Sequence, residues 1–139
     1  MTIEEKIAEY KDDLDLFDDV NAKFEYIFDL GKKHTTLPEE QKNDATAVVG
    51  CASPAWLVAD YRDGKIFFSA EGSSEMAKGM LVLLLDIFDK HTPDEILAFD
   101  PKKLEELGII QHLSPVRQKS LEAFLQKVYA YAKKYKELS

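Results

Sequence analysis

The sequence predicts an α+β domain in which a small antiparallel β-sheet of about three strands packs against several α-helices. Two observations favour this fold class. An Asp63-Gly64 pair separates two runs of alternating apolar residues, which is typical of a two-residue hairpin turn. Apolar residues recur at helical spacing in the flanking segments, several of which begin with a capping residue. At 139 residues, 45% of them hydrophobic, the chain is expected to form a single domain over residues 1–139.

The segment before the hairpin is predicted to form two helices and a loop. Thr2 and Glu5 have the spacing of a capping box, and apolar residues follow at helical intervals. A second apolar stripe starts at Val20 and runs toward Gly31, a residue type that suits the C-terminal cap of a helix. Residues 34–46 show no steady period and are predicted to be a connecting loop.

The hairpin is predicted to bury one of its faces. If Arg62 lies opposite Lys65, six apolar side chains share a face that should be buried. They are Leu57, Ala59, Tyr61, Ile66, Phe68 and Ala70. Trp56 falls on the other face, so its indole is expected to be partly accessible. Residues 47–49 are expected to add a third strand, which would put Cys51 on the turn between two strands.

The segment after the hairpin is predicted to be helical. Ser73 or Ser74 can cap a helix that is apolar around most of its circumference, which predicts a central, buried helix. Three capping residues are each followed by a proline at the first helical position. These pairs are Thr92-Pro93, Asp100-Pro101 and Ser114-Pro115. Two short helices and one long amphipathic C-terminal helix are therefore expected.

Composition argues against several classes of protein. A net charge of -8 and a pI near 4.9 argue against nucleic-acid binding, which needs a basic surface. The longest apolar run, residues 80–85, is too short to cross a membrane. The N-terminal segment lacks the layout of a signal peptide, and one cysteine permits no internal disulfide, so a cytoplasmic location is expected. His34, His91 and His112 are isolated from one another, so no metal site is expected.

Charge is also unevenly distributed along the chain. Residues 1–20 carry eight acidic and two basic side chains, whereas residues 114–139 carry six basic and two acidic ones. Two solvated helix faces explain this pattern. A charged docking surface is the alternative interpretation.

Cys51 is the only cysteine, and it lies in a break between apolar segments. A lone thiol in a loop is a candidate nucleophile, because sulfur chemistry needs a thiolate that an exposed loop and nearby cations can supply. The alternative is a small buried hydrophobic side chain. Gly50 relieves backbone restriction beside the cysteine, and Ser53 offers a hydroxyl donor.

Two cations are candidates for supporting this thiol. Arg117 is predicted at the third position of the last helix, where the helix dipole disfavours a positive charge. Either Arg117 forms an ion pair with a carboxylate of the acidic N-terminal segment, or it faces a thiolate, a persulfide or the carboxylate of cysteine. Lys78 raises the same question near the start of the buried helix, and its simpler interpretation is a side chain that extends to solvent.

Four segments, in order and in spacing, resemble the motifs of one family. They are residues 24–33 followed by Leu37-Pro38, the Gly50-Cys51-Ala52-Ser53-Pro54-Ala55-Trp56 segment, the Ala77-Lys78-Gly79-Met80 segment and residues 107–117 with His112, Ser114-Pro115 and Arg117. Together they resemble the SufE/CsdE family, the sulfur-acceptor partners of cysteine desulfurases. The chain departs from the family pattern at Pro54, Ala55 and Ser120. Ala47-Val48 also replaces a segment that is often polar or basic.

The resemblance implies a SufE/IscU-like fold and a role for Cys51 as a persulfide acceptor. Cys51 would take sulfur from the persulfide of a pyridoxal-phosphate cysteine desulfurase, stimulate that enzyme, and pass the sulfur to an iron–sulfur scaffold or another acceptor. No cofactor of its own is expected, because one thiolate attacks the outer sulfur of another persulfide directly. The supporting candidates are Ser53, Trp56, Lys78, His112 and Arg117. The cysteine loop is expected to rest against Trp56 and apolar helix surface, and to open when the desulfurase docks.

Two other functions remain open at this point. The chain could be a binding module that activates a desulfurase without carrying sulfur. It could also be a stand-alone thiol hydrolase using Cys51 with His112, although no oxyanion-hole or triad signature accompanies that pair.

Overall fold

The computed structural model describes residues 2–34, 36–50 and 53–138, and it confirms the predicted α+β class. Its helices and strands are α1 (Ile3–Leu14), α2 (Val20–Leu30), β1 (Ala55–Arg62), β2 (Lys65–Gly72), α3 (Glu75–Phe88), α4 (Pro93–Ala98) and α5 (Pro115–Leu138). Four short 3₁₀ segments are η1 (Gly31–Lys33), η2 (Glu39–Gln41), η3 (Pro101–Leu107) and η4 (Ile110–His112). The regular elements thus follow the predicted order along the chain.

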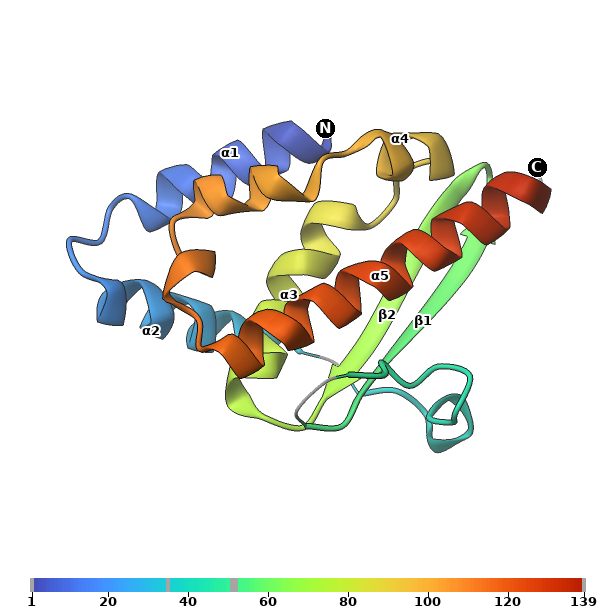
Figure 1. Cartoon of the computed structure of the whole chain (residues 1–139), viewed down its shortest axis with the longest axis horizontal. Coiled ribbons are helices and arrows are strands. Elements are labelled where there is room, and N and C mark those ends of the chain that lie inside the picture. The colour runs from blue at the N-terminus through green and yellow to red at the C-terminus, as the bar shows by residue number, and fades with distance from the viewer. Residues whose placement is uncertain (1, 35, 51–52, 139) are drawn as a thin grey trace.

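Helix α3 lies at the centre of the molecule, as its apolar sequence predicts. It packs against α2 on one side and β2 on the other, while the long helix α5 packs against β1 and α4 (Figure 1). Helix α1 packs against η3 and α3. The α3 side chains Leu83, Ile87 and Phe88 are fully buried. Burial of this helix from several sides therefore creates one hydrophobic core that includes residues of every helix and both strands.

The predicted helix starts are confirmed by their caps. Thr2 and Thr92 each form a complete capping box with a glutamate three residues later. Of the two candidate serines before α3, Ser74 is the cap. The Ser114 hydroxyl accepts a hydrogen bond from the backbone N–H of Arg117 at the start of α5. The segment after Asp100 is also helical, but it forms the 3₁₀ segment η3.

The hairpin has the predicted turn and register. Asp63 and Gly64 have φ angles of 53° and 78°, so both adopt the left-handed conformation that a type I′ turn needs. Arg62 lies opposite Lys65. On the face predicted to be apolar, Leu57 and Ile66 are fully buried, while Trp56 on the opposite face is only partly exposed. The turn therefore sets which face of the two-stranded sheet enters the core.

The expected third strand is wrong. Residues 47–49 contribute one isolated bridge, Ala47 to Trp56, and the described sheet has two strands. Two backbone hydrogen bonds flank this bridge: the N–H of Val48 donates to the carbonyl of Ala55 at 2.9 Å, and the N–H of Leu57 donates to that of Thr46 at 2.8 Å. The tyrosines of α5 bond to the next two carbonyls along the same edge of β1. Tyr131 donates to the carbonyl of Leu57 at 2.8 Å, and Tyr135 donates to that of Ala59 at 3.2 Å. Because residues 46–48 and the tyrosines of α5 together satisfy this edge, β1 is protected without a full third strand.

Candidate functional site

A pocket of about 320 Å³ lies between the N-terminal parts of α3 and α5. Most of its lining is apolar. The apolar lining includes Met76, Met80, Leu81, Leu84, Leu121 and Phe124. Its polar lining consists of Ser53, Ser74, Ser114, Arg117 and Ser120. An apolar cavity with a few polar groups at its margin is the usual form of a binding site.

The starts of two helices meet at this pocket. Ser74 caps α3 and Ser114 caps α5, and both serines line the pocket. The N-terminus of a helix carries a partial positive charge and unpaired backbone N–H groups. The guanidinium of Arg117 adds a full positive charge to the same lining. The pocket is therefore suited to a negatively charged group beside an apolar one.

Arg117 occupies the third position of α5, as predicted from the sequence. Its side chain is exposed, and within the described residues no carboxylate forms an ion pair with it. An ion pair with the acidic N-terminal segment was one of the two interpretations of this cation. The structure contains no such pair in the ranges that it describes, so no carboxylate of these ranges relieves the dipole conflict at Arg117.

Cys51 lies outside the described residues, as does its immediate neighbour Ala52. The expectation that Cys51 sits on a turn between two strands depended on the third strand, which residues 47–49 do not form. The expectation that its loop rests against Trp56 stays a prediction. The nearest described residues on either side of Cys51 and Ala52 are Gly50 and Ser53. Ser53 lines the pocket. Gly50 has a φ of 102° and lies against α5, where an added Cβ would be 3.2 Å from that of Ala123.

Three other candidate residues do not line the pocket. Trp56 lies on the opposite face of β1, where the ammonium of Lys42 is 5.5 Å from its ring centroid. His112 is exposed on η4, although the two residues after it reach the pocket. Lys78 is half-buried near η1, where its Cβ is 3.4 Å from the Cβ that an alanine at Gly31 would carry. Of the five supporting candidates, the structure brings Ser53 and Arg117 together.

A family model described as "SufE: Fe-S metabolism associated domain" matches residues 8–132. The chain belongs to the SufE family. A solved structure supports the fold of this SufE-family chain: the solution structure of a hypothetical protein from Thermus thermophilus, with a TM-score of 0.76. The two chains are 19% identical over 93% of this chain and 94% of the other. The resemblance seen in the sequence is confirmed, and SufE membership associates the chain with iron–sulfur metabolism.

The sequence did not point to most of the residues that line the SufE-domain pocket. Met76, Val116 and Ser120 all belong to its lining. Met76 and Val116 each occupy the second position of a helix, α3 and α5 respectively. An apolar residue at the second position of a capped helix is a sequence signal for such a pocket. At that position the side chain lies beside the end of the helix and outside the apolar stripe that faces the core. Only the pocket that both helix starts line shows that the two starts meet.

No metal centre or membrane span is found where the structure describes the SufE domain. In residues 2–34, 36–50 and 53–138, no group of three or more His, Cys, Asp or Glu side chains is placed to hold a metal ion. None of the helices in these ranges has the length and apolar character that a membrane span requires.

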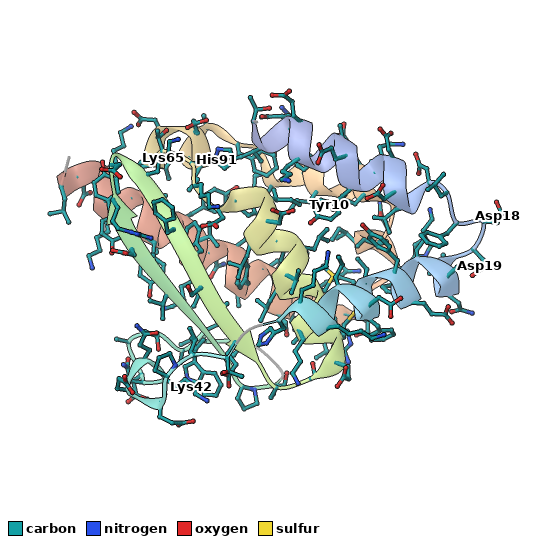
Figure 2. The ribbon with its side chains drawn as sticks, turned by 180° about the vertical axis from the view of Figure 1, so that it is seen from behind. Tyr10, Asp18, Asp19, Lys42, Lys65 and His91 are labelled. Carbon is teal, nitrogen blue, oxygen red and sulfur yellow. The ribbon has the colours of Figure 1, made fainter. Side chains whose placement is uncertain are left out.

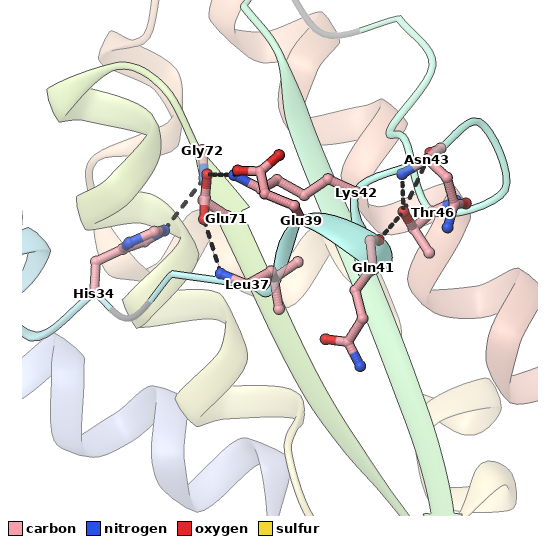
Figure 3. A network of polar contacts seen from close by, with 9 residues as sticks. All are labelled: His34, Leu37, Glu39, Gln41, Lys42, Asn43, Thr46, Glu71 and Gly72. Atoms are coloured by element: carbon pink, nitrogen blue, oxygen red, sulfur yellow. Dashed lines mark hydrogen bonds and ion pairs between the residues drawn. The ribbon is translucent and has the colours of Figure 1, made fainter.

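A polar network holds the loop that precedes the cysteine segment (Figure 3). The carboxylate of Glu71, near the end of β2, accepts a hydrogen bond from the backbone N–H of Leu37 at 2.8 Å and one from the ammonium of Lys42 at 2.9 Å. Both charged side chains are only 15% exposed. The Lys42 and Leu37 hydrogen bonds hold the pKa of Glu71 below its ordinary value of 4.5. The network thus fixes the predicted loop to the sheet.

Replacing Glu71 by glutamine is expected to lower the thermal unfolding midpoint by about 4 °C, because the charge-assisted bond to Lys42 is lost. Glu39→Gln is the matched control, since the Glu39 side chain contacts the same ammonium but is 88% exposed. The stability that Glu71 contributes is present above pH 4.5 and is lost as the pH falls through the lowered pKa. An equal midpoint for Glu71→Gln and Glu39→Gln would contradict the assignment of Glu71 as the anchor.

His34 is bound to the same end of the sheet, also visible in Figure 3. Its Nε2 accepts a hydrogen bond from the backbone N–H of Gly72 at 3.2 Å. Burial, and then the positive charge of Lys78, lower the pKa of His34 below 6.5. The neutral form is therefore favoured in the folded protein, and the acceptor nitrogen is free of a proton.

Stability is expected to fall as the pH drops below 6.5, because the unfolded chain then binds a proton at His34 that the folded chain resists. In His34→Gln this part of the pH dependence should disappear, since a glutamine oxygen accepts the bond without titrating. Unfolding midpoints measured across the pH range test this. The control variant His112→Gln, at an exposed residue, should show the same dependence of the unfolding midpoint on pH as the wild type. If His34→Gln also shows this same dependence, the effect of pH arises from another group.

Proposed function

We propose that the chain is a sulfur acceptor that uses Cys51 to take a persulfide sulfur from a pyridoxal-phosphate cysteine desulfurase. The thiolate of Cys51 attacks the outer sulfur of the persulfide on the desulfurase. A new S–S bond forms on Cys51, the S–S bond on the desulfurase breaks, and its cysteine leaves as a thiolate. Charge and electrons balance, so the step needs no external oxidant and no cofactor of this chain. The sulfur then passes to an iron–sulfur scaffold or another acceptor.

The observation that supports this proposal is the position of Ser53, two residues after Cys51, in the lining of a pocket that also contains Arg117. The attacking thiolate and an ionised persulfide are both anions. Two helix starts and a guanidinium favour such an anion. A sulfur held at this pocket would be shielded from water and from other thiols by the apolar side chains that line it. This combination suits a sulfur carrier, whose persulfide must form on contact with the desulfurase and must not react further until the next acceptor binds.

A single experiment separates this proposal from the alternatives. The protein is incubated with the cysteine desulfurase of the same organism and free cysteine, and its intact mass is then measured. One added sulfur that a reductant removes is expected. A protein that stimulates the desulfurase but gains no sulfur would instead be a binding module. A protein that hydrolyses esters without a partner would be a thiol hydrolase, but His112 does not line the pocket, so no observation favours that activity.

We also propose that this reaction takes place in the cytoplasm. A chain whose one cysteine must stay a free thiol is suited to a reducing compartment. Fractionation of the native cells, followed by detection of the protein, tests this location.

A further inference from the structure

We propose that Lys127 of α5 is a positioning residue for sulfur transfer, which holds the chain leading to Cys51 against α5 and so limits the access of small thiols to the Cys51 sulfur. The inference rests on the proposed function, because the sulfur that needs protection is the one that Cys51 carries. Lys127 lies outside the four segments that resemble the family motifs, and the contacts in the structure point to it instead.

The ammonium of Lys127 bonds to the loop that precedes the cysteine segment. It donates a hydrogen bond to the backbone carbonyl of Ala45 at 2.9 Å, and it lies 5.3 Å from the ring centroid of Tyr131. In the described ranges no carboxylate forms an ion pair with this ammonium. Burial lowers the pKa of Lys127, so the ammonium is partly removed from water. A charged donor forms a stronger hydrogen bond where water is partly excluded.

The acceptor carbonyl belongs to a turn that is held by its own hydrogen bonds. The side-chain oxygen of Asn43 accepts a hydrogen bond from the N–H of Ala45 at 2.9 Å, and the backbone carbonyl of Asn43 accepts one from the N–H of Ala47 at 2.9 Å. Figure 2 shows Lys42, next to this turn, at the end of the hairpin opposite to Lys65. The bond to Ala45 therefore holds the whole turn at the end of the hairpin where β1 begins.

The turn leads directly into the cysteine segment. The N–H of Val48 donates to the carbonyl of Ala55 at 2.9 Å, and this bond closes the loop of residues 49–54, which contains Cys51. One foot of the loop thus continues from the turn that Lys127 binds. Loss of the Lys127 bond would free the turn from α5, and the loop would follow it.

The side of α5 that carries Lys127 also carries the pocket and a contact with the loop. Arg117 and Ser120 line the pocket, and an added Cβ at Gly50 would be 3.2 Å from the Cβ of Ala123. These α5 residues follow one another at intervals of three or four, which places them on one side of the helix. Because Lys127 continues this row by one turn, its bond fixes the loop relative to the cation of the pocket.

The reaction of Cys51 with iodoacetamide, followed by the intact mass of the full chain without a desulfurase, tests this position. Lys127→Met removes the ammonium but keeps an unbranched side chain over Tyr131, and it is expected to react about fivefold faster than the wild type. Lys127→Arg keeps a charged donor and should react at about the wild-type rate. Lys134→Met is the matched control, because the exposed Lys134 also lies 5.3 Å from a tyrosine ring, that of Tyr135. It should react like the wild type.

The direction of the change separates positioning from a direct electrostatic role. A cation beside a thiol favours the reactive thiolate, so the loss of such a cation would slow the reaction. A slower reaction of Lys127→Met would therefore overturn the inference. An unchanged rate with a lowered unfolding midpoint would make Lys127 a purely structural contact and would overturn it as well. All rates are measured well below the unfolding midpoints of the variants.

The carried sulfur provides the second measurement. Each protein is loaded by the desulfurase and cysteine, separated from both, and treated with glutathione. The glutathione thiolate attacks the outer sulfur on Cys51: an S–S bond forms on glutathione, the S–S bond on Cys51 breaks, and the Cys51 thiolate leaves. Lys127→Met is expected to lose its sulfur about fivefold faster than the wild type, whereas Lys127→Arg and Lys134→Met should lose it at about the wild-type rate.

Failure of this inference is distinguishable from failure of the proposed function. If the wild type gains sulfur but Lys127→Met loses it no faster, the positioning role is wrong and the carrier function stands. If the wild type gains no sulfur while iodoacetamide reacts faster with Lys127→Met and not with Lys127→Arg, the carrier function fails and the positioning of Cys51 by Lys127 stands.

Discussion

Replacing Cys51 by serine is expected to abolish sulfur loading by the desulfurase and cysteine, whereas the wild type gains one sulfur atom. A serine hydroxyl does not ionise near neutral pH and cannot form a persulfide, and the chain contains no second cysteine. Intact mass before and after treatment with a reductant measures this directly. The mass of the wild type should return to its original value after reduction, and the mass of the variant should stay unchanged throughout.

Serine has nearly the shape of cysteine, so this variant is expected to remain folded and to bind the desulfurase. Its unfolding midpoint and its affinity for the enzyme serve as controls. Stimulation of desulfurase turnover should fall, because the enzyme loses the acceptor that frees its own cysteine. If the variant stimulates the desulfurase as strongly as the wild type does, activation depends on binding alone and Cys51 is not the acceptor.

Replacing Gly79 by alanine is expected to destabilise the fold by about 3 kcal/mol. An added Cβ at Gly79 would lie 2.2 Å from the carbonyl oxygen of Ile27 in α2, a distance that no side-chain adjustment can relieve. The backbones of α2 and α3 would have to separate, and the core between them would open. In an exposed helix the same substitution would stabilise by about 1 kcal/mol. The free energy of unfolding, measured in urea, tests the prediction.

Gly31→Ala is the matched control for this contact, because Gly31 follows α2 and packs against the same Gly79 of α3 at a longer distance. Its added Cβ would be 3.2 Å from the backbone nitrogen of Gly79, and Gly31 has an ordinary right-handed φ of -60°. A much smaller loss is therefore expected. Equal losses for the two variants would show that general crowding, and not the approach of Gly79 to Ile27, limits this interface.

Features set by neighbouring residues were predictable from the sequence. The register of the hairpin follows from Asp63-Gly64, because a two-residue turn leaves one way to pair the strands. The helix starts at Thr2, Ser74 and Ser114 follow from side chains that bond to backbone groups within three residues. The position of Arg117 at the third residue of α5 follows in the same way.

Features set by distant residues were not predictable. Residues 47–49 were expected to add a third strand, yet they contribute one bridge, and tyrosines of the last helix, far along the chain, bond to two further carbonyls on that edge of β1. Gly31 was expected as an ordinary helix cap. The structure shows that its small size matters because Gly79 of α3 approaches it closely. Neither the bonds of the tyrosines to β1 nor the approach of Gly79 to Gly31 can be recognised from the residues next to them in the sequence.

The order of the α-helices and of the two hairpin strands, the buried face of the hairpin, the family, and the one cysteine of the chain all follow from the sequence without the fold. These features depend on local hydrogen bonds, on the spacing of apolar residues and on the presence of a single thiol. The meeting of the starts of α3 and α5 around an apolar pocket came from the three-dimensional arrangement instead. So did the finding that Arg117 and Ser53 line this pocket while Lys78, Trp56 and His112 do not. Helix packing sets these positions, because the direction of each side chain depends on how closely and at what angle two distant helices approach.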